Sequence, residues 1–283
     1  MKKILVPTDF SKISITALEV AFDIAKKAGA TVYVLHVVEE AGADSFHITG
    51  EWQKENWDDR LYIYKLLERG KKQLEKLVHD PRFDSVKMVG ELRLGNPFHG
   101  MNAIISEEKV DLVVMGTRGQ TNLEAMVIGT NTERVVRNSR CPILTIHKKP
   151  ATTDFKNIVY ATAMSKDEEI FSRIVKSTQK IYNSTIHMVR INTPADFQRD
   201  RIVKDYMAKF AKSLQLKNFT LNVYNDISEE EGILYFANSI DADLIAMATH
   251  GRTGFAHVLA GSIAEDVVKK AGRPVLTYVI KNK

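Results

Sequence analysis

The chain has 283 residues, 44% of them hydrophobic and 27% charged, an ordinary composition for a soluble globular protein with room for two domains of about 140 residues each. The 40 Lys and Arg residues outnumber the 35 Asp and Glu residues by five, which permits an anionic ligand. Because no cluster of basic residues is interleaved with aromatic ones, we expect no nucleic-acid binding. Cys141 is the single cysteine, so an intramolecular disulfide is excluded. The sequence also has no signal-peptide pattern and no apolar run of about 18 residues. We therefore expect a cytoplasmic protein with no membrane span.

The first half alternates short apolar runs with amphipathic stretches, which is typical of a parallel sheet covered by helices on both faces. Its opening run stops at Pro7, Ser11 or Asp9 can cap the helix that follows, and Gly29 ends that helix. We expect strands at 3–7, 31–38, 86–92, 110–115 and 141–147, and helices at 13–28, 61–78, 98–107 and 132–138.

The second half repeats this order after a polar linker at 148–154. We expect strands at 157–162, 185–191, 220–224, 244–247 and 275–280, and helices at 167–182, 195–214, 229–239 and 263–271. The sequence therefore predicts two domains of the same kind, with limits at 1–148 and 155–283.

Glycines after the fourth strand of each half identify a tandem duplication. Gly251 aligns with Gly119 and Gly261 with Gly129, both 132 residues later. The offset is 151 residues at the second strand, so the first half has 19 extra residues between its second and fourth strands.

Residues 39–60 contain this insertion and both tryptophans of the chain, Trp52 and Trp57. No clear period runs through the segment, so we expect a loop or a short helix before the helix at 61–78. The tryptophans either pack against the domain surface, which is the commoner role, or cover a ligand or contact a partner protein.

The stretch 115–132 has sequence features of a phosphate-binding loop. Gly116 and Gly119 follow a buried apolar strand, and Gly129 and Thr130 precede a helix. Glycines let a phosphate approach backbone N–H groups, and the positive end of the helix dipole favours an anion there. Glycines after a strand are more often plain turn residues, so the loop alone leaves both interpretations open.

Three motifs together resemble the universal stress protein family, specifically its tandem members with two domains in one chain. They are the opening ILVPTDFS at 4–11, LHVVE at 35–39, and the pattern G-x-x-G, nine residues, G-[ST], which here runs from Gly116 to Thr130. The resemblance covers essentially the whole chain. It implies two doubly wound, Rossmann-like α/β domains with five parallel strands each, and a nucleotide crevice at the carboxyl ends of the strands.

The resemblance also implies that the last strand of each half is an edge strand. The runs 142–146 and 274–279 are apolar, and an unpaired apolar edge invites association. We therefore expect these two strands to pair antiparallel and to join the halves as an internal pseudo-dimer, which leaves room for a further homodimer.

By resemblance, the first half would bind ATP, with Mg²⁺ allowed as counter-ion. Its base and ribose would lie against residues at the ends of three strands: Pro7, Thr8, Asp9, Val38, Met115 and Gly116. Its phosphates would lie against the glycine loop and the next helix: Arg118, Gly119, Gly129, Thr130, Asn131 and Thr132. Asp9 can accept a hydrogen bond from the exocyclic amine of adenine, while Arg118 either adds charge or is simply solvated.

The second half departs from this pattern at both ends of the expected ligand. Alanines stand where the first half has Pro7, Asp9, Gly116 and Thr132; they are Ala161, Ala163, Ala248 and Ala264. Gly251, Gly254, Gly261 and Ser262 remain, which leaves a weaker phosphate or sulfate site. His250 and His257 have no third candidate ligand near them, so we expect no metal site.

Three functions fit these observations. The first is a regulatory protein that binds adenine nucleotide and changes its conformation or its protein partner. The second is an interaction scaffold of the same fold that binds no nucleotide. The third is an enzyme. The sequence argues against it, because it has no G-x-x-x-x-G-K-[ST] motif, no carboxylate cluster after a strand and no recognisable Ser-His-acid set. We therefore expect no catalytic residue and at most slow ATP hydrolysis.

Overall fold

The computed structural model describes residues 1–39, 57–117, 130–139, 141–250 and 262–280. The first half contains β1 (Lys3–Pro7), α1 (Lys12–Ala28), β2 (Thr31–Val38), α2 (Trp57–Val78), η1 (Pro81–Phe83), β3 (Met88–Leu94), α3 (Pro97–Glu108), β4 (Leu112–Gly116), α4 (Thr130–Asn138) and β5 (Ile143–Ile146). The second half contains β6 (Asn157–Ala161), η2 (Lys166–Glu168), α5 (Glu169–Tyr182), β7 (Thr185–Asn192), α6 (Asp200–Ser213), β8 (Phe219–Asn225), α7 (Glu229–Ser239), β9 (Leu244–His250), α8 (Ser262–Lys270) and β10 (Val275–Ile280).

All ten strands join one sheet in the order β3-β2-β1-β4-β5-β10-β9-β6-β7-β8. Within each half every strand pair is parallel, as in a doubly wound sheet. The two halves meet where β5 and β10 pair antiparallel, with Leu144 opposite Leu276. The predicted fold class and the predicted pairing of the two edge strands are both confirmed.

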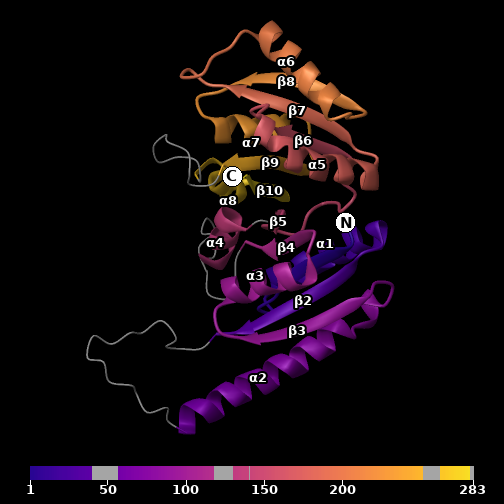
Figure 1. Ribbon diagram of the computed structural model, residues 1–283, viewed down its shortest axis with the longest axis vertical. Helices are drawn as coiled ribbons and strands as arrows, with labels where there is room; N and C mark the ends of the chain where they lie inside the picture. Colours follow the sequence, from indigo (N-terminus) through magenta and orange to yellow (C-terminus); the bar gives the residue numbers. More distant parts are fainter. Residues whose placement is uncertain (40–56, 118–129, 140, 251–261, 281–283) are drawn as a thin grey trace, which may run out of the picture.

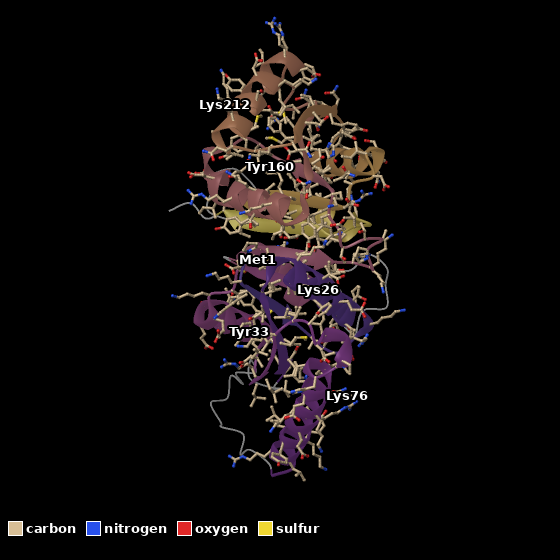
Figure 2. The ribbon with its side chains drawn as sticks, turned by 90° about the vertical axis from the view of Figure 1, so that its right-hand side faces the viewer. Met1, Lys26, Tyr33, Lys76, Tyr160 and Lys212 are labelled. Carbon is tan, nitrogen blue, oxygen red and sulfur yellow. The ribbon has the colours of Figure 1, made fainter. Side chains whose placement is uncertain are left out.

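The sheet runs along the long axis of the molecule, with β3 and β8 at its opposite ends (Figure 1). Figure 2 shows the same stacking from the side, with Lys76 of α2 toward one end and Lys212 of α6 toward the other. Among the described residues, no helix is long and apolar enough to cross a membrane.

One hydrophobic core extends across the junction between the halves. It contains Ile4 and Leu144 from the first half together with Ile158, Tyr160 and Leu276 from the second, all at most 4% exposed. On the opposite face of the sheet each half has its own smaller core. The shared core means that neither half can separate without exposing apolar side chains to water.

Helix α1 shows how local sequence signals fix these elements. The Ser11 side chain accepts a hydrogen bond from the backbone N–H of Ser14, and Gly29 ends the helix in the left-handed conformation at φ 65°. The buried face of the helix includes Leu18, Ala21 and Ile24. This face packs on the sheet beside β1 and β4, the strands whose ends frame the expected site.

The linker between the halves packs against α1. Thr153 donates a hydrogen bond from its hydroxyl to Asp23 at 2.8 Å, and the Lys27 ammonium lies 3.1 Å from the carboxylate of Asp154. Phe155, the residue after the linker, is 1% exposed. The linker is therefore part of the folded unit.

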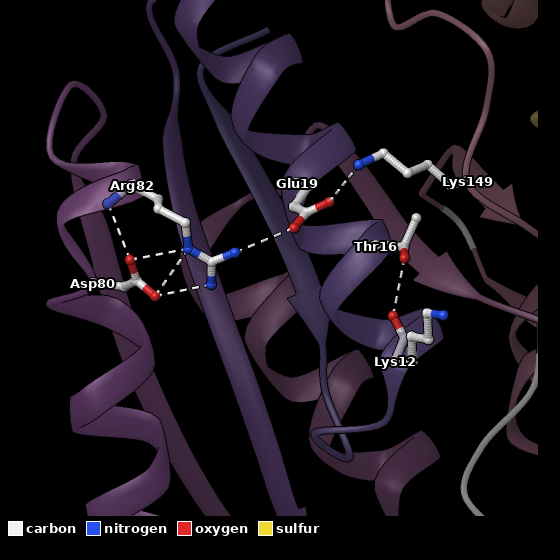
Figure 3. Close-up of polar contacts among 6 residues, drawn as sticks. All are labelled: Lys12, Thr16, Glu19, Asp80, Arg82 and Lys149. Carbon is white, nitrogen blue, oxygen red and sulfur yellow. Dashed lines mark hydrogen bonds and ion pairs between the residues drawn. The ribbon is translucent and has the colours of Figure 1, made fainter.

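A chain of surface charges continues from the linker along the same face (Figure 3). The Lys149 ammonium lies 3.7 Å from Glu19, and the guanidinium of Arg82 lies 3.3 Å from Glu19 and 2.8 Å from Asp80. Because these side chains are solvent-accessible, each pair contributes only about 0–1 kcal/mol. They orient η1 against α1 more than they stabilise the fold.

Three predicted element limits were wrong by three residues or more. One is the end of β9, which lies at His250 and not at 247. Helix α6 starts at Asp200 and not at 195, because residues 193–199 form a turn. The Asn192 side-chain amide donates to the carbonyl of Gln198 at 2.9 Å and holds that turn closed. Helix α2 starts at Trp57, inside the stretch predicted as a loop or short helix; Trp52 lies outside the described residues.

We predict that Leu276→Ala destabilises the whole chain by about 2–5 kcal/mol, because it removes a buried side chain from the seam and the shared core. Chemical denaturation followed by circular dichroism measures this. Ile227→Ala is the matched control, since that side chain is 81% exposed and its loss should change stability by less than about 0.5 kcal/mol. Loss of stability in the second half alone, with the first half unfolding as before, would contradict a cooperative seam.

Candidate functional site

Each half has a topological switch point, where the chain leaves adjacent strands in opposite directions. In the first half it lies between β1 and β4, and in the second between β6 and β9. In open α/β sheets, ligands bind in the crevice outside the carboxyl ends of such strands. The residues after β1, β4, β6 and β9 therefore define two candidate crevices in one molecule.

After β1, a tight turn fixes the residues predicted to face adenine. Thr8 is 6% exposed, and its hydroxyl lies 3.0 Å from the hydroxyl of Ser14 and accepts from the backbone N–H of Phe10 at 3.0 Å. The Asp9 carboxylate accepts from the backbone N–H of Ser11 at 3.0 Å. Asp9 is thus a half-buried turn residue at the mouth of the first crevice, next to the cap of α1, and Pro7 ends the strand beside it.

Val38 and Met115, at the ends of β2 and β4, are 6% and 5% exposed and supply apolar surface at the same edge of the sheet. Gly116 ends β4, and a Cβ atom there would lie 3.0 Å from Cγ2 of Ile13 and 3.3 Å from its backbone carbonyl carbon. Close packing of α1 is therefore one reason for a glycine at this position, beside the predicted approach to ribose.

Thr132 is 4% exposed, and its hydroxyl donates a hydrogen bond to the carbonyl oxygen of Gly116 at 3.1 Å. In this arrangement the hydroxyl joins α4 to the end of β4, and its proton does not point at a phosphate. Helix α4 starts at Thr130, so its N-terminus follows the glycine loop as predicted. Arg118, Gly119 and Gly129 lie outside the described residues, as do the side chains of Thr130 and Asn131.

The second crevice is a pocket of about 200 Å³ at the ends of β6, β7 and β9. Residues from these strands and from η2, α7 and α8 line it: Ala161, Thr162, Ala163, Glu168, Val189, Arg190, Ile191, Glu229, Ile233, Met247, Ala248, Ile263 and Ala264. The set includes the four alanines that replace the predicted nucleotide contacts of the first half. The pocket therefore lies where the repeat predicts a site, with a different lining.

Glu168 is a buried carboxylate in this second crevice, and the sequence analysis missed it. It is 2% exposed, and its oxygens accept hydrogen bonds from the hydroxyls of Tyr160 at 2.8 Å and Thr162 at 2.7 Å. They also accept from the backbone N–H groups of Ala163 at 3.1 Å and Ser165 at 3.2 Å. A signal was present, because Glu168 stands 154 residues after Ser14, at the first-strand offset of the repeat.

Two further charged residues of this crevice were also missed. Arg190 forms an ion pair with Asp196, and only 12% of its side chain is exposed. Glu229 is the first residue of α7. Glu229 is an exposed residue, but partial desolvation of its carboxyl at the edge of the crevice raises its pKa, while the nearby Arg190 guanidinium opposes that shift.

Two further observations concern titratable groups outside the crevices. Cys141 is 3% exposed, burial raises the pKa of its thiol to about 12, and the thiol donates to the carbonyl of Val110, so this cysteine is a buried packing residue. In the described part of the chain, no three His, Cys, Asp or Glu side chains gather in a way that could hold a metal ion.

Two doubly wound units in one chain, each with a switch point at the carboxyl ends of its strands, define a tandem α/β protein. The model of the Universal stress protein family matches the sequence twice, over residues 1–147 and 154–278. The chain belongs to the universal stress protein family.

Known proteins agree with this assignment. Universal stress protein MJ0531 of Methanocaldococcus jannaschii is 36% identical over 149 residues, which is 53% of this chain and 83% of that protein. Universal stress protein Slr1230 of Synechocystis is 23% identical over 292 residues and covers 98% of this chain and 100% of its own length. The crystal structure of a universal stress protein from Archaeoglobus fulgidus has the same fold across 98% of both chains, with a TM-score of 0.74 at 20% identity.

We predict that Glu168→Ala destabilises the chain by about 1–3 kcal/mol, because two hydroxyls and two backbone N–H groups lose their acceptor. Urea denaturation at pH 7 measures the difference. Glu169→Ala is the matched control, since its side chain is 66% exposed and pairs only at the surface with Arg173. Equal effects of the two substitutions would mean that the buried hydrogen bonds of Glu168 contribute nothing to the fold.

Proposed function

We propose that this chain is a cytoplasmic regulatory protein that binds ATP, or a related adenine nucleotide, in its first half. The observation that carries the proposal is the meeting of two segments at one switch point. Strands β1 and β4 are direct neighbours, with Leu5 opposite Val113, so the Asp9 turn and the start of the glycine loop follow adjacent strand ends. An adenine acceptor and a phosphate loop are then within the reach of one ligand.

The phosphate end of the proposed site rests on sequence and on the position of α4. The pattern G-x-x-G, nine residues, G-Thr runs from Gly116 to Thr130, and α4 begins at that threonine. Free backbone N–H groups at a helix N-terminus attract phosphate, and glycine permits its close approach. The proposed contacts remain those given above, with the hydroxyl of Thr132 assigned to positioning α4.

In this proposal the protein is not an enzyme, and ATP, with Mg²⁺ on its phosphates, acts as a ligand that shifts conformation or the choice of protein partner. The proposed domain limits are 1–148 and 155–283.

The competing function is a scaffold that binds no nucleotide. Heat release of bound nucleotide from the purified chain, identified by absorbance and mass, separates the two: an empty protein that also takes up no added ATP is a scaffold.

We predict that Asp9→Ala and Gly119→Val each weaken ATP binding about fivefold or more, because loss of one hydrogen bond or of close backbone approach costs about 1 kcal/mol or more. Titration calorimetry on the whole chain measures this. Gly251→Val is the matched control, since Gly251 is the repeat counterpart of Gly119 in the half that lacks the adenine acceptor. If Gly251→Val weakens the main binding event and Gly119→Val does not, the nucleotide lies in the second half.

A further inference from the structure

An ion pair with a buried carboxylate crosses the seam between the two halves. Arg137, in the last turn of α4, donates through Nε and through one terminal nitrogen to the two carboxylate oxygens of Glu265, the second bond at 2.6 Å. Glu265 lies in the first turn of α8, and only 5% of its side chain is exposed. The pair therefore joins the helix before β5 to the helix before β10, and Figure 1 shows these helices on either side of the seam.

Burial of the Glu265 carboxylate makes this contact different from the surface ion pairs of the first half. Loss of the guanidinium would leave the carboxylate unpaired away from water, which costs more than the loss of an exposed pair. The planar fork of Arg137 binds both oxygens at once, a geometry that a lysine cannot form. The fork therefore fixes the direction of α4 relative to α8.

The repeat offset of 132 residues shows that this contact is one-sided. Lys269 is the counterpart of Arg137, and the counterpart of Glu265 is Glu133. Two symmetrical halves would bring Lys269 to Glu133. Lys269 instead lies 4.0 Å from Asp266 of its own helix, and Glu133 lies 2.9 Å from Arg137 of its own helix. Among the described residues, the second half thus holds α4 by an ion pair, and α8 receives no equivalent one in return.

Helix α4 depends on tertiary contacts for its position. It has nine residues, and helices this short are marginal in water unless packing holds them. Val135 and Val136 bury one face of it in the core of the first half, and the Thr132 hydroxyl joins its N-terminal end to the end of β4. Arg137 joins its C-terminal end to the second half. Contacts at both ends therefore set the tilt of α4 and the direction of its first N–H groups.

We propose that Glu265 of the second half is a positioning residue for the nucleotide site of the first half. The inference rests on the proposed function, in which the N-terminus of α4 faces the phosphates. Glu265 acts through Arg137 and not on the ligand itself. The sign of its effect separates these roles: a carboxylate that acts on ATP by charge alone repels this anion, so its removal would tighten binding, whereas removal of a positioning carboxylate weakens binding.

Titration calorimetry with ATP on the whole chain tests the proposal. Glu265→Gln should weaken binding about fivefold or more, which is the lower end of typical coupling between sites. Arg137→Lys keeps the charge and removes the fork, so it should weaken binding as well. The double variant should weaken binding no more than the stronger single one, because both act through one contact. Lys269→Gln is the matched control, since this counterpart of Arg137 pairs within its own helix, and it should leave the Kd unchanged.

The outcomes distinguish this inference from the proposed function. If the unmodified chain binds no ATP, the proposed function is wrong and this inference falls with it. If ATP binds and Glu265→Gln leaves the Kd unchanged or tightens binding, the inference alone is overturned. Additive weakening in the double variant also overturns it, because the two residues would then act separately.

Hydrogen exchange followed by mass spectrometry needs no substitution and decides the matter even if a variant fails to fold. Coupling between sites is reciprocal, so saturating ATP should slow amide exchange in α8 as well as in α4 of the unmodified chain. In Glu265→Gln, saturating ATP should slow exchange in α4 only. A mere loss of stability would speed exchange in α8 without removing its response to ATP. Exchange in α8 that ignores ATP in the unmodified chain overturns the proposal.

Discussion

The antiparallel pairing of β5 with β10 is the interaction on which the rest of the structure depends. Each half would otherwise end in an apolar edge strand, and joining the two edges turns two five-stranded sheets into one of ten. Leu144 and Leu276 face each other there inside a core shared by both halves. Next to the seam, Arg137 of α4 donates through two nitrogens to Glu265 of α8, whose side chain is 5% exposed. The helices that follow the two glycine loops are therefore in direct contact.

Duplication gave this molecule two crevices at equivalent places, and the lining of each explains how they differ. In the first, hydroxyl groups of Thr8 and Ser14 contact each other after β1, and Asp9 lies at the mouth. In the second, Glu168 takes the place of Ser14 and binds the backbone N–H groups after β6. A carboxylate supplied by the chain thus occupies donors that a bound anion would otherwise use. We infer that the second half does not accept the ligand of the first.

Apolar runs predicted the strands well because a parallel sheet buried on both faces leaves little choice of residue. The seam was predictable because unpaired apolar edges are costly. The start of α6 was not, since a side-chain bond from Asn192 to Gln198 closes the turn before it. Glu168 was missed because an acidic residue at the start of a helix is normally exposed to solvent, where it interacts favourably with the helix dipole. Only the tertiary fold buries Glu168 beside Tyr160. The structure places the site residues up to Gly116, and also Thr132, while the glycine loop between them is a prediction from sequence.

Native mass spectrometry of the whole chain with excess ATP tests the central claim most directly, which is that only one of the two crevices accepts the nucleotide. The account predicts a single ATP adduct per chain, on the first crevice. Two ATP molecules on one chain would contradict it, because the second crevice would then accept a polyphosphate despite the buried carboxylate of Glu168.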